Sequence, residues 1–126
     1  MTRPTLYSIV ESPAHPDFSD LYARLGYEAL RFPSMRQAMA KLKRRPPAVV
    51  VAEFFYGWGN NYAGVNISNL DVLLYSLQKY ASQAKVIAMV EKTERQYVDK
   101  LNAILPLHGV LIQPVDQDAM ERLLRG

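Results

Sequence analysis

The most constraining feature of the sequence is an apolar stretch, PAVVVAEFF, at residues 47–55. It has neither helical spacing nor alternation of polar and apolar side chains, which is typical of a strand buried on both faces of a parallel sheet. Its only charged residue, Glu53, stands at the end of the predicted strand. Open α/β sheets place their sites at the carboxyl ends of their strands. Glu53 is therefore either a site residue or only the charge that marks where the strand meets water.

Strand-like and helix-like segments alternate along the rest of the chain. Including the stretch above, the expected strands are residues 5–10, 27–32, 47–55, 85–90 and 109–112. Apolar residues at helical spacing predict helices over 17–25, 34–45, 68–80 and 93–105, and a last one that carries Met120, Leu123 and Leu124. Capping-box patterns mark helix starts at Ser34, Ser68 and Thr93.

This alternation predicts the fold class. Five strands that alternate with five helices through mostly short connections require parallel strands and right-handed crossovers. The expected fold is α/β, a three-layer sandwich with a doubly wound, five-stranded parallel sheet. The chain of 126 residues has the commonest size of one domain, so residues 1–126 are expected to form a single domain.

Composition excludes several classes of function. The chain has no cysteine, so it has no disulfide, thiolate metal site or cysteine nucleophile. No apolar run approaches the ~20 residues that cross a bilayer, and no signal-peptide pattern is present, so a soluble cytoplasmic protein without membrane association is expected. His15 and His108 fall toward opposite ends of the predicted sheet, so no histidine pair or metal site is expected. No glycine-rich phosphate loop follows the first strand, so no cofactor is predicted.

Positive charge is concentrated at one place. Lys41, Lys43, Arg44 and Arg45 fall within a short segment at the end of the second predicted helix. Such a cluster is either a phosphate-binding patch or a basic helix end that complements the helix dipole. No nucleic-acid-binding motif accompanies it, so the helix-end interpretation is preferred and nucleic acid is not an expected partner.

Polar or charged residues follow most of the predicted strands. Glu11 and Ser12 come after the first strand, Glu53 ends the third, and Gln113-Pro114 follows the fifth. The order of elements and these positions resemble the receiver domain of two-component response regulators, the CheY-like family. The resemblance spans nearly the whole chain and rests on topology and spacing. It implies a flavodoxin-like sheet with strand order 2-1-3-4-5.

The family's reactive residues are mostly replaced. Receivers carry an acidic pair after the first strand, a phosphorylated aspartate after the third, a serine or threonine after the fourth, an aromatic switch residue in the fifth, and a lysine followed by proline after it. The matching positions here are Glu11 and Ser12, Glu53, Val90, Val110, and Gln113 with Pro114. Only the proline and the carboxylate character of two positions are kept.

These replacements remove most of what phosphorylation of a carboxylate requires. The reaction needs a divalent cation held by several oxygens, and the family's lysine and hydroxyl contact the phosphoryl group. Gln113 carries no charge and Val90 has no hydroxyl. Three interpretations of Glu53 stay open: a pocket that has decayed into a structural strand end, a longer side chain that mimics phosphoaspartate, and surviving phosphotransfer.

A long loop over residues 56–66 follows Glu53 where receivers usually have a short one. It is rich in glycine and asparagine and carries Tyr56, Trp58 and Tyr62. Long loops in compact domains are commonly functional, and exposed aromatic rings are typical interface anchors. The alternative is that these rings fold back over the top of the sheet.

The resulting hypothesis is a stand-alone pseudo-receiver that is not an enzyme. It would act in signal transduction through phosphorylation-independent protein–protein interaction. Its partner surface would be the loop over 56–66 or the face of the fourth helix, fifth strand and fifth helix, which carries Tyr97, Lys100 and Arg122 and which many receivers use to form homodimers. The alternative is a small-ligand- or metal-binding flavodoxin-like domain, or an enzyme, that uses Glu11 and Glu53.

Overall fold

The computed structural model describes residues 3–11, 17–56 and 68–126. In this part of the chain, five parallel strands form one sheet with the order β2-β1-β3-β4-β5. The strands are β1 (Thr5–Ile9), β2 (Glu28–Phe32), β3 (Val49–Glu53), β4 (Lys85–Val90) and β5 (Gly109–Ile112). The predicted fold class and strand order are therefore confirmed.

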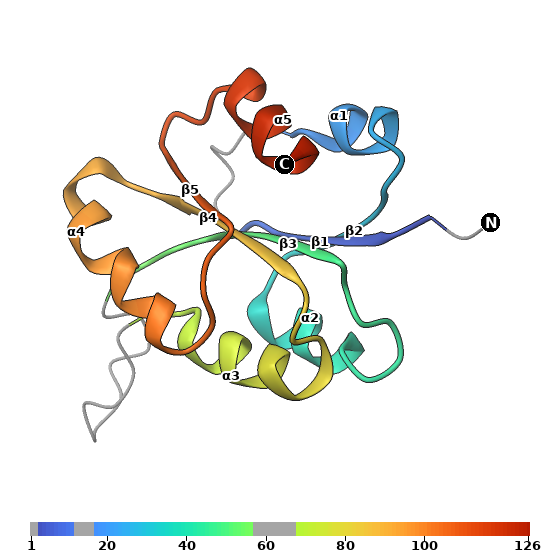
Figure 1. Ribbon diagram of the computed structural model, residues 1–126, viewed down its shortest axis with the longest axis horizontal. Coiled ribbons are helices and arrows are strands. Elements are labelled where there is room, and N and C mark those ends of the chain that lie inside the picture. The colour runs from blue at the N-terminus through green and yellow to red at the C-terminus, as the bar shows by residue number, and fades with distance from the viewer. Residues whose placement is uncertain (1–2, 12–16, 57–67) are drawn as a thin grey trace.

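Helices cover both faces of the sheet, which gives three layers (Figure 1). The pair α1 (Ser19–Arg24) and α5 (Gln117–Arg125) lies on one face. The other face carries α2 (Met35–Lys41), α3 (Asp71–Tyr80) and α4 (Arg95–Val98). No helix in the described part of the chain is long and apolar enough to cross a membrane.

The central strand β3 is buried along its whole length. Val49 and Val51 belong to the core beneath α1 and α5, whereas Val50 and Ala52 belong to the core beneath α2, α3 and α4. Because side chains alternate between the two faces of a strand, a strand with an apolar core on each side needs an unbroken apolar run. The prediction of a strand buried on both faces is therefore confirmed for Val49–Glu53, whereas the ends of the predicted stretch, residues 47–48 and 54–55, lie outside the strand.

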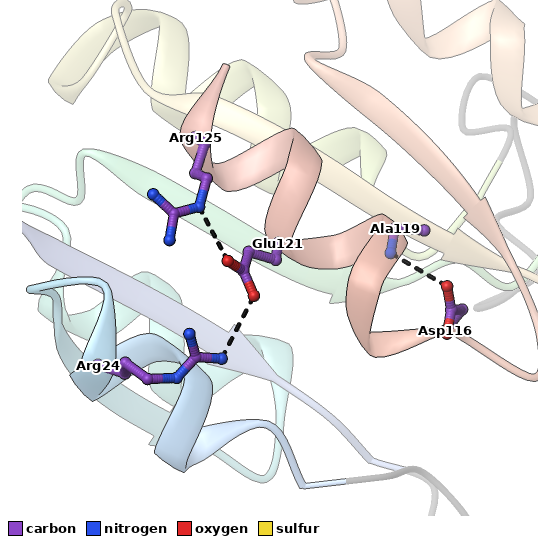
Figure 2. Close-up of polar contacts among 5 residues, drawn as sticks. All are labelled: Arg24, Asp116, Ala119, Glu121 and Arg125. Atoms are coloured by element: carbon purple, nitrogen blue, oxygen red, sulfur yellow. Dashed lines mark hydrogen bonds and ion pairs between the residues drawn. The ribbon is translucent and has the colours of Figure 1, made fainter.

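Local sequence signals explain several helix ends. Ser34 caps α2 by accepting a hydrogen bond from the Gln37 N–H at 3.2 Å, and Asp116 caps α5 by accepting one from the Ala119 N–H at 3.2 Å (Figure 2). After α1 the chain turns at Gly26, whose φ of 92° lies in the region that favours glycine.

An ion-pair network joins α1 to α5 on the outside of the sheet (Figure 2). Glu121 of α5 accepts hydrogen bonds from Arg125 at 2.9 Å and from Arg24 of α1 at 3.3 Å. The bond from Arg125 is the main cause, and that from Arg24 a smaller one, of a pKa of the Glu121 carboxyl below its ordinary value. The network is exposed to solvent, so it orients the two helices more than it stabilises them.

The helix predicted over residues 93–105, with a cap at Thr93, is wrong in detail. The segment consists of a 3-10 turn at Lys92–Glu94, the short helix α4 and a second 3-10 turn at Asp99–Ala103, and no side chain caps its starts. Asn102 explains part of the difference, because its side chain bonds the Asp99 carbonyl and the Leu107 N–H and so competes with helical bonding. The buried residues Val98 and Leu101 are three positions apart, which suits the 3-10 spacing.

Candidate functional site

The carboxyl ends of β1, β3, β4 and β5 bring the predicted site residues together at one end of the sheet. Glu53, the last residue of β3, pairs with Met89 of β4. The Gln113 N–H, after β5, donates to the Val90 carbonyl at 2.9 Å. Glu11 follows β1, and its N–H donates to Glu53. The equivalents of the receiver pocket therefore lie side by side, except for Ser12, which lies outside the described residues.

Glu53 is a buried carboxylate and does not mark where the strand meets water. Its residue is 2% exposed, so the interpretation as a solvated strand end is wrong. Its Oε1 atom accepts a hydrogen bond from the Glu11 N–H at 2.8 Å. A buried carboxylate is costly unless it is hydrogen-bonded, and the backbone of the segment after β1 supplies such a bond. Glu53 therefore ties the end of β3 to the chain that leaves β1.

The Glu11 side chain is exposed, unlike Glu53. Partial burial, followed by the charge of Glu53, raises the pKa of the Glu11 carboxyl above its ordinary value of 4.5. A raised pKa means that the folded state holds this proton more tightly than the unfolded state does. The neutral carboxyl thus favours folding at low pH, and this contribution is lost as the pH rises through the folded-state pKa.

Glu11→Gln is therefore expected to be more stable than the wild type at pH 7. Glutamine stays neutral, and the variant keeps the backbone N–H that binds Glu53. The difference in the free energy of unfolding should shrink as the pH falls below the ordinary value of 4.5, where the glutamate is also neutral. Urea denaturation at pH 7 and at about pH 3.5 measures it, and a difference that does not change with pH would contradict this account.

The positions that match the receiver's hydroxyl, aromatic and lysine residues carry apolar or neutral side chains here. Val90 is fully buried and Val110 is partly buried against the same core. Gln113 is joined by a cis peptide bond to Pro114, which is exposed. None of these side chains brings a positive charge or a hydroxyl to a phosphoryl group.

The possible metal ligands in this chain are the side chains of Asp, Glu and its two histidines. No group of three or more His, Asp or Glu side chains that could hold a metal ion occurs there. His108 lies with its Nε2 atom 2.6 Å from the Leu123 carbonyl, between β5 and α5. His15 lies outside the described residues.

Both ends of the loop over residues 56–66, here called the aromatic loop, are fastened to each other by Asn69. Its side chain donates to the Glu53 carbonyl at 2.8 Å and accepts from the Phe55 N–H at 2.7 Å. Tyr56 and Ser68 add an antiparallel bridge. Asn69 is 9% exposed, so these bonds are shielded from water. The four residues Phe55, Tyr56, Ser68 and Asn69 form what we call the loop neck.

The start of α3 continues from the loop neck. Asp71 is 1% exposed and accepts hydrogen bonds from both the N–H and the hydroxyl of Ser68, each at 2.8 Å. The Ser68 hydroxyl in turn accepts from the Leu70 N–H at 3.1 Å. The helix start predicted at Ser68 is therefore wrong, because α3 begins at Asp71 with Leu70 at its N-cap and without a side-chain cap. Ser68 instead forms a polar turn before the helix through its bonds to Asp71.

Tyr56 connects the aromatic loop to α4. Its ring stacks on Tyr97 with centroids 3.7 Å apart and an interplanar angle of 15°. Its N–H donates to Glu94 Oε1 at 3.1 Å. Tyr56 is 44% exposed, so it does not fold back over the sheet. Trp58 and Tyr62 lie outside the described residues.

The two predicted partner surfaces therefore meet at this stack. Lys100 has its Nζ atom 6.0 Å from the Tyr97 ring centroid. Ile112 of β5 is 45% exposed, and Arg122 of α5 is also exposed. Three residues of this region were not predicted from the sequence: Asn69, Glu94 and Ile112. Of these, only Asn69 could have been found from the local sequence, because it stands in a polar turn just after the loop.

Comparison with known proteins shows the fold. No family model matches the sequence, and no curated protein matches it. Among solved structures, a response regulator from Thermotoga maritima has a TM-score of 0.73 at 13% identity, over 98% of this chain and 96% of that one. The signal receiver domain of an HD domain-containing protein from Pseudomonas fluorescens has a TM-score of 0.70 at 17% identity, over 98% and 93%. A Francisella response regulator receiver domain has a TM-score of 0.70 at 12% identity, over 97% and 94%.

These neighbours are response regulator receiver domains, and this chain has their fold. At such low identity the likeness says nothing about shared chemistry. What the site does must be argued from its own side chains.

Proposed function

We propose that residues 1–126 form one pseudo-receiver domain that acts in cytoplasmic signal transduction through protein–protein interaction, without phosphorylation and without enzymatic activity of its own. The receiver fold supports a signalling role. The observation that carries the proposal is the state of Glu53, which is 2% exposed and bound through Oε1 to the Glu11 N–H.

Burial of Glu53 opposes phosphoryl transfer. In phosphoryl transfer, a carboxylate oxygen must reach the phosphorus atom in line with the leaving group. A cation must also neutralise the charge of the incoming phosphoryl group. The Glu53 carboxylate is covered, and the neighbouring positions hold Val90 and Gln113, which bring neither a hydroxyl nor a positive charge. Of the three interpretations of Glu53, the geometry therefore favours a structural carboxylate.

Mimicry of phosphoaspartate is the weaker interpretation. A mimic acts by presenting its charge to the switch residues that read a phosphoryl group. Here one carboxylate oxygen is bound to backbone at the end of β1, on the side of β3 away from β4 and β5. Val90 and Val110 also lack polar atoms that could respond to that charge.

The proposed partner surface centres on the stacked rings of Tyr56 and Tyr97, with Lys100 beside Tyr97. The exposed Ile112 of β5 is proposed as a further contact. Tyrosine and other aromatic residues supply much of the binding energy at protein interfaces. Trp58 and Tyr62 are proposed as further contacts in the aromatic loop. A homodimer through the same face is part of this proposal, and a monomeric sedimentation profile at high concentration would count against that part.

Incubation with acetyl phosphate and Mg²⁺ tests the absence of phosphorylation. The intact mass of the wild type is expected to stay unchanged under conditions in which a receiver with the usual aspartate gains one phosphoryl group. Glu53→Gln serves as the matched control, because it keeps the oxygen that accepts from the Glu11 N–H but cannot be phosphorylated. A mass increase in the wild type that is absent from Glu53→Gln would overturn the proposal.

A further inference from the structure

A cavity of about 460 Å³ lies beside β2, the edge strand of the sheet, and none of the candidate site residues lines it. We call it the edge cavity. Its apolar wall comes from β2, and its cationic wall comes from the segment that ends α2. The lining residues are Ala29, Leu30, Arg31, Phe32, Lys41, Arg44 and Arg45. Its volume falls within the range of ~300–1,000 Å³ that is usual for small-molecule sites.

The cationic wall is held in place by the turn that ends α2. Both Arg44 and Arg45 donate their N–H groups to the Lys41 carbonyl, at 3.0 and 2.8 Å, which folds the chain back beside the helix end. The hydroxyl of buried Tyr7 donates to the Arg45 carbonyl. The basic cluster is therefore more than a solvated helix end, because Lys41, Arg44 and Arg45 of this turn all line one cavity.

Two of the four cations in the cavity wall have carboxylate partners. Arg45 pairs with Glu28, and Arg31 lies 3.5 Å from Asp17. Within the described part of the chain, no ion pair joins the other two, Lys41 and Arg44, to an acid. The edge cavity therefore offers positive charge that its own surroundings leave uncompensated.

The free edge of β2 adds hydrogen-bond donors. The Glu28 N–H donates to the Pro4 carbonyl, and the Phe32 carbonyl accepts from the Val10 N–H, so these two residues turn their backbone toward β1. Since backbone groups alternate along a strand, Ala29 and Arg31 turn theirs toward the open edge. Both residues line the edge cavity.

We propose that the edge cavity binds a small phosphate-bearing molecule with an apolar or aromatic body. Lys41 and Arg44 would hold the phosphate by charge-assisted hydrogen bonds, with the outward N–H groups of Ala29 and Arg31 as neutral donors. The apolar body would lie against Leu30 and Phe32. A peptide that pairs with β2 as an added strand fits less well, because only Ala29 and Arg31 point their backbone groups outward in the part of β2 that lines the cavity. This inference does not depend on the state of Glu53.

Titration of the uniformly ¹⁵N-labelled protein with phenyl phosphate, inorganic phosphate and phenol tests the proposal. Phenyl phosphate is expected to shift the amide resonances of Ala29, Arg31 and Arg44 and to bind about tenfold more tightly than inorganic phosphate, because its ring buries apolar surface. Phenol alone should produce no saturable shift. Equal affinity for the two phosphates would assign the site to inorganic phosphate and overturn the apolar half of the proposal.

Three single variants locate the binding. Lys41→Gln and Arg44→Gln are each expected to weaken phenyl phosphate binding about fivefold, because each removes one charge from the cavity wall. Lys43→Gln removes the same charge from the same cluster, but Lys43 lies 6.0 Å from the Tyr80 ring centroid and does not line the cavity. It should change the affinity less than twofold. Equal losses in all three variants, or no binding by the wild type, would overturn the proposal.

Discussion

Leu74→Ala is expected to lower the free energy of unfolding by about 3 kcal/mol, within the usual range of about 2–5 kcal/mol for this substitution in a core. Leu74 lies in the middle of α3 and is completely buried in the core between the sheet and α2, α3 and α4. Removing its branched end loses buried apolar area and leaves a cavity that close-packed neighbours fill only in part.

Val72→Ala is the matched control on the same helix, because Val72 is 46% exposed. Its loss should stay within about 0.5 kcal/mol, the usual effect of a surface substitution. Urea denaturation followed by far-ultraviolet circular dichroism measures both variants. Similar losses in the two variants would mean that α3 does not pack on the sheet through the face described above.

Asn69→Ala is expected to lower the free energy of unfolding by about 3 kcal/mol. The variant leaves the Glu53 carbonyl and the Phe55 N–H without their bonds to Asn69. Losing a hydrogen bond to a shielded backbone group costs about 1–3 kcal/mol, and the variant loses two such bonds. The loop neck keeps the Tyr56–Ser68 bridge and the bond from the Asn69 N–H to the Phe55 carbonyl, so it should loosen and let the Tyr56 ring shift on Tyr97. The change in tyrosine packing would appear in the near-ultraviolet circular dichroism spectrum.

Asn102→Ala is an informative control for Asn69→Ala. Asn102 also makes one bond to a backbone carbonyl and one to a backbone N–H, at 3.0 and 2.8 Å, but it is exposed. Water replaces such partners, so its loss should cost less than about 1 kcal/mol. Equal costs at the two positions would contradict the view that burial of the loop neck makes Asn69 important.

The strands were predictable because their signals are local. The run in β3 needs no knowledge of its neighbours, since only a strand covered on both faces tolerates five consecutive buried residues. The turn at Gly26 and the cap at Ser34 are also encoded within a few residues. The segment of α4 was harder, because its apolar spacing fits both an α-helix and a 3-10 turn, and the bonds of Asn102 favour the turn only at its end.

The site was predictable in its position but not in its state. Topology places Glu11 and Glu53 at adjacent strand ends, yet only the structure tells that Glu53 is covered and bound to the Glu11 backbone. The stacking of Tyr56 on Tyr97 joins residues far apart in the sequence, and no periodic pattern predicts such a contact. The same limit applies to the edge cavity, because the basic cluster alone does not tell which of its side chains face β2.

Addition of beryllofluoride and Mg²⁺ to the ¹⁵N-labelled protein tests the central claim, that this receiver fold works without a phosphorylated state. Beryllofluoride with Mg²⁺ imitates an acyl phosphate on a receptive carboxylate. We expect the amide resonances of Glu11, Glu53, Val90 and Val110 to stay unchanged at saturating concentrations. Saturable shifts at Glu53 and Val90 that Glu53→Gln abolishes would contradict the claim and show that the pocket still accepts a phosphoryl group.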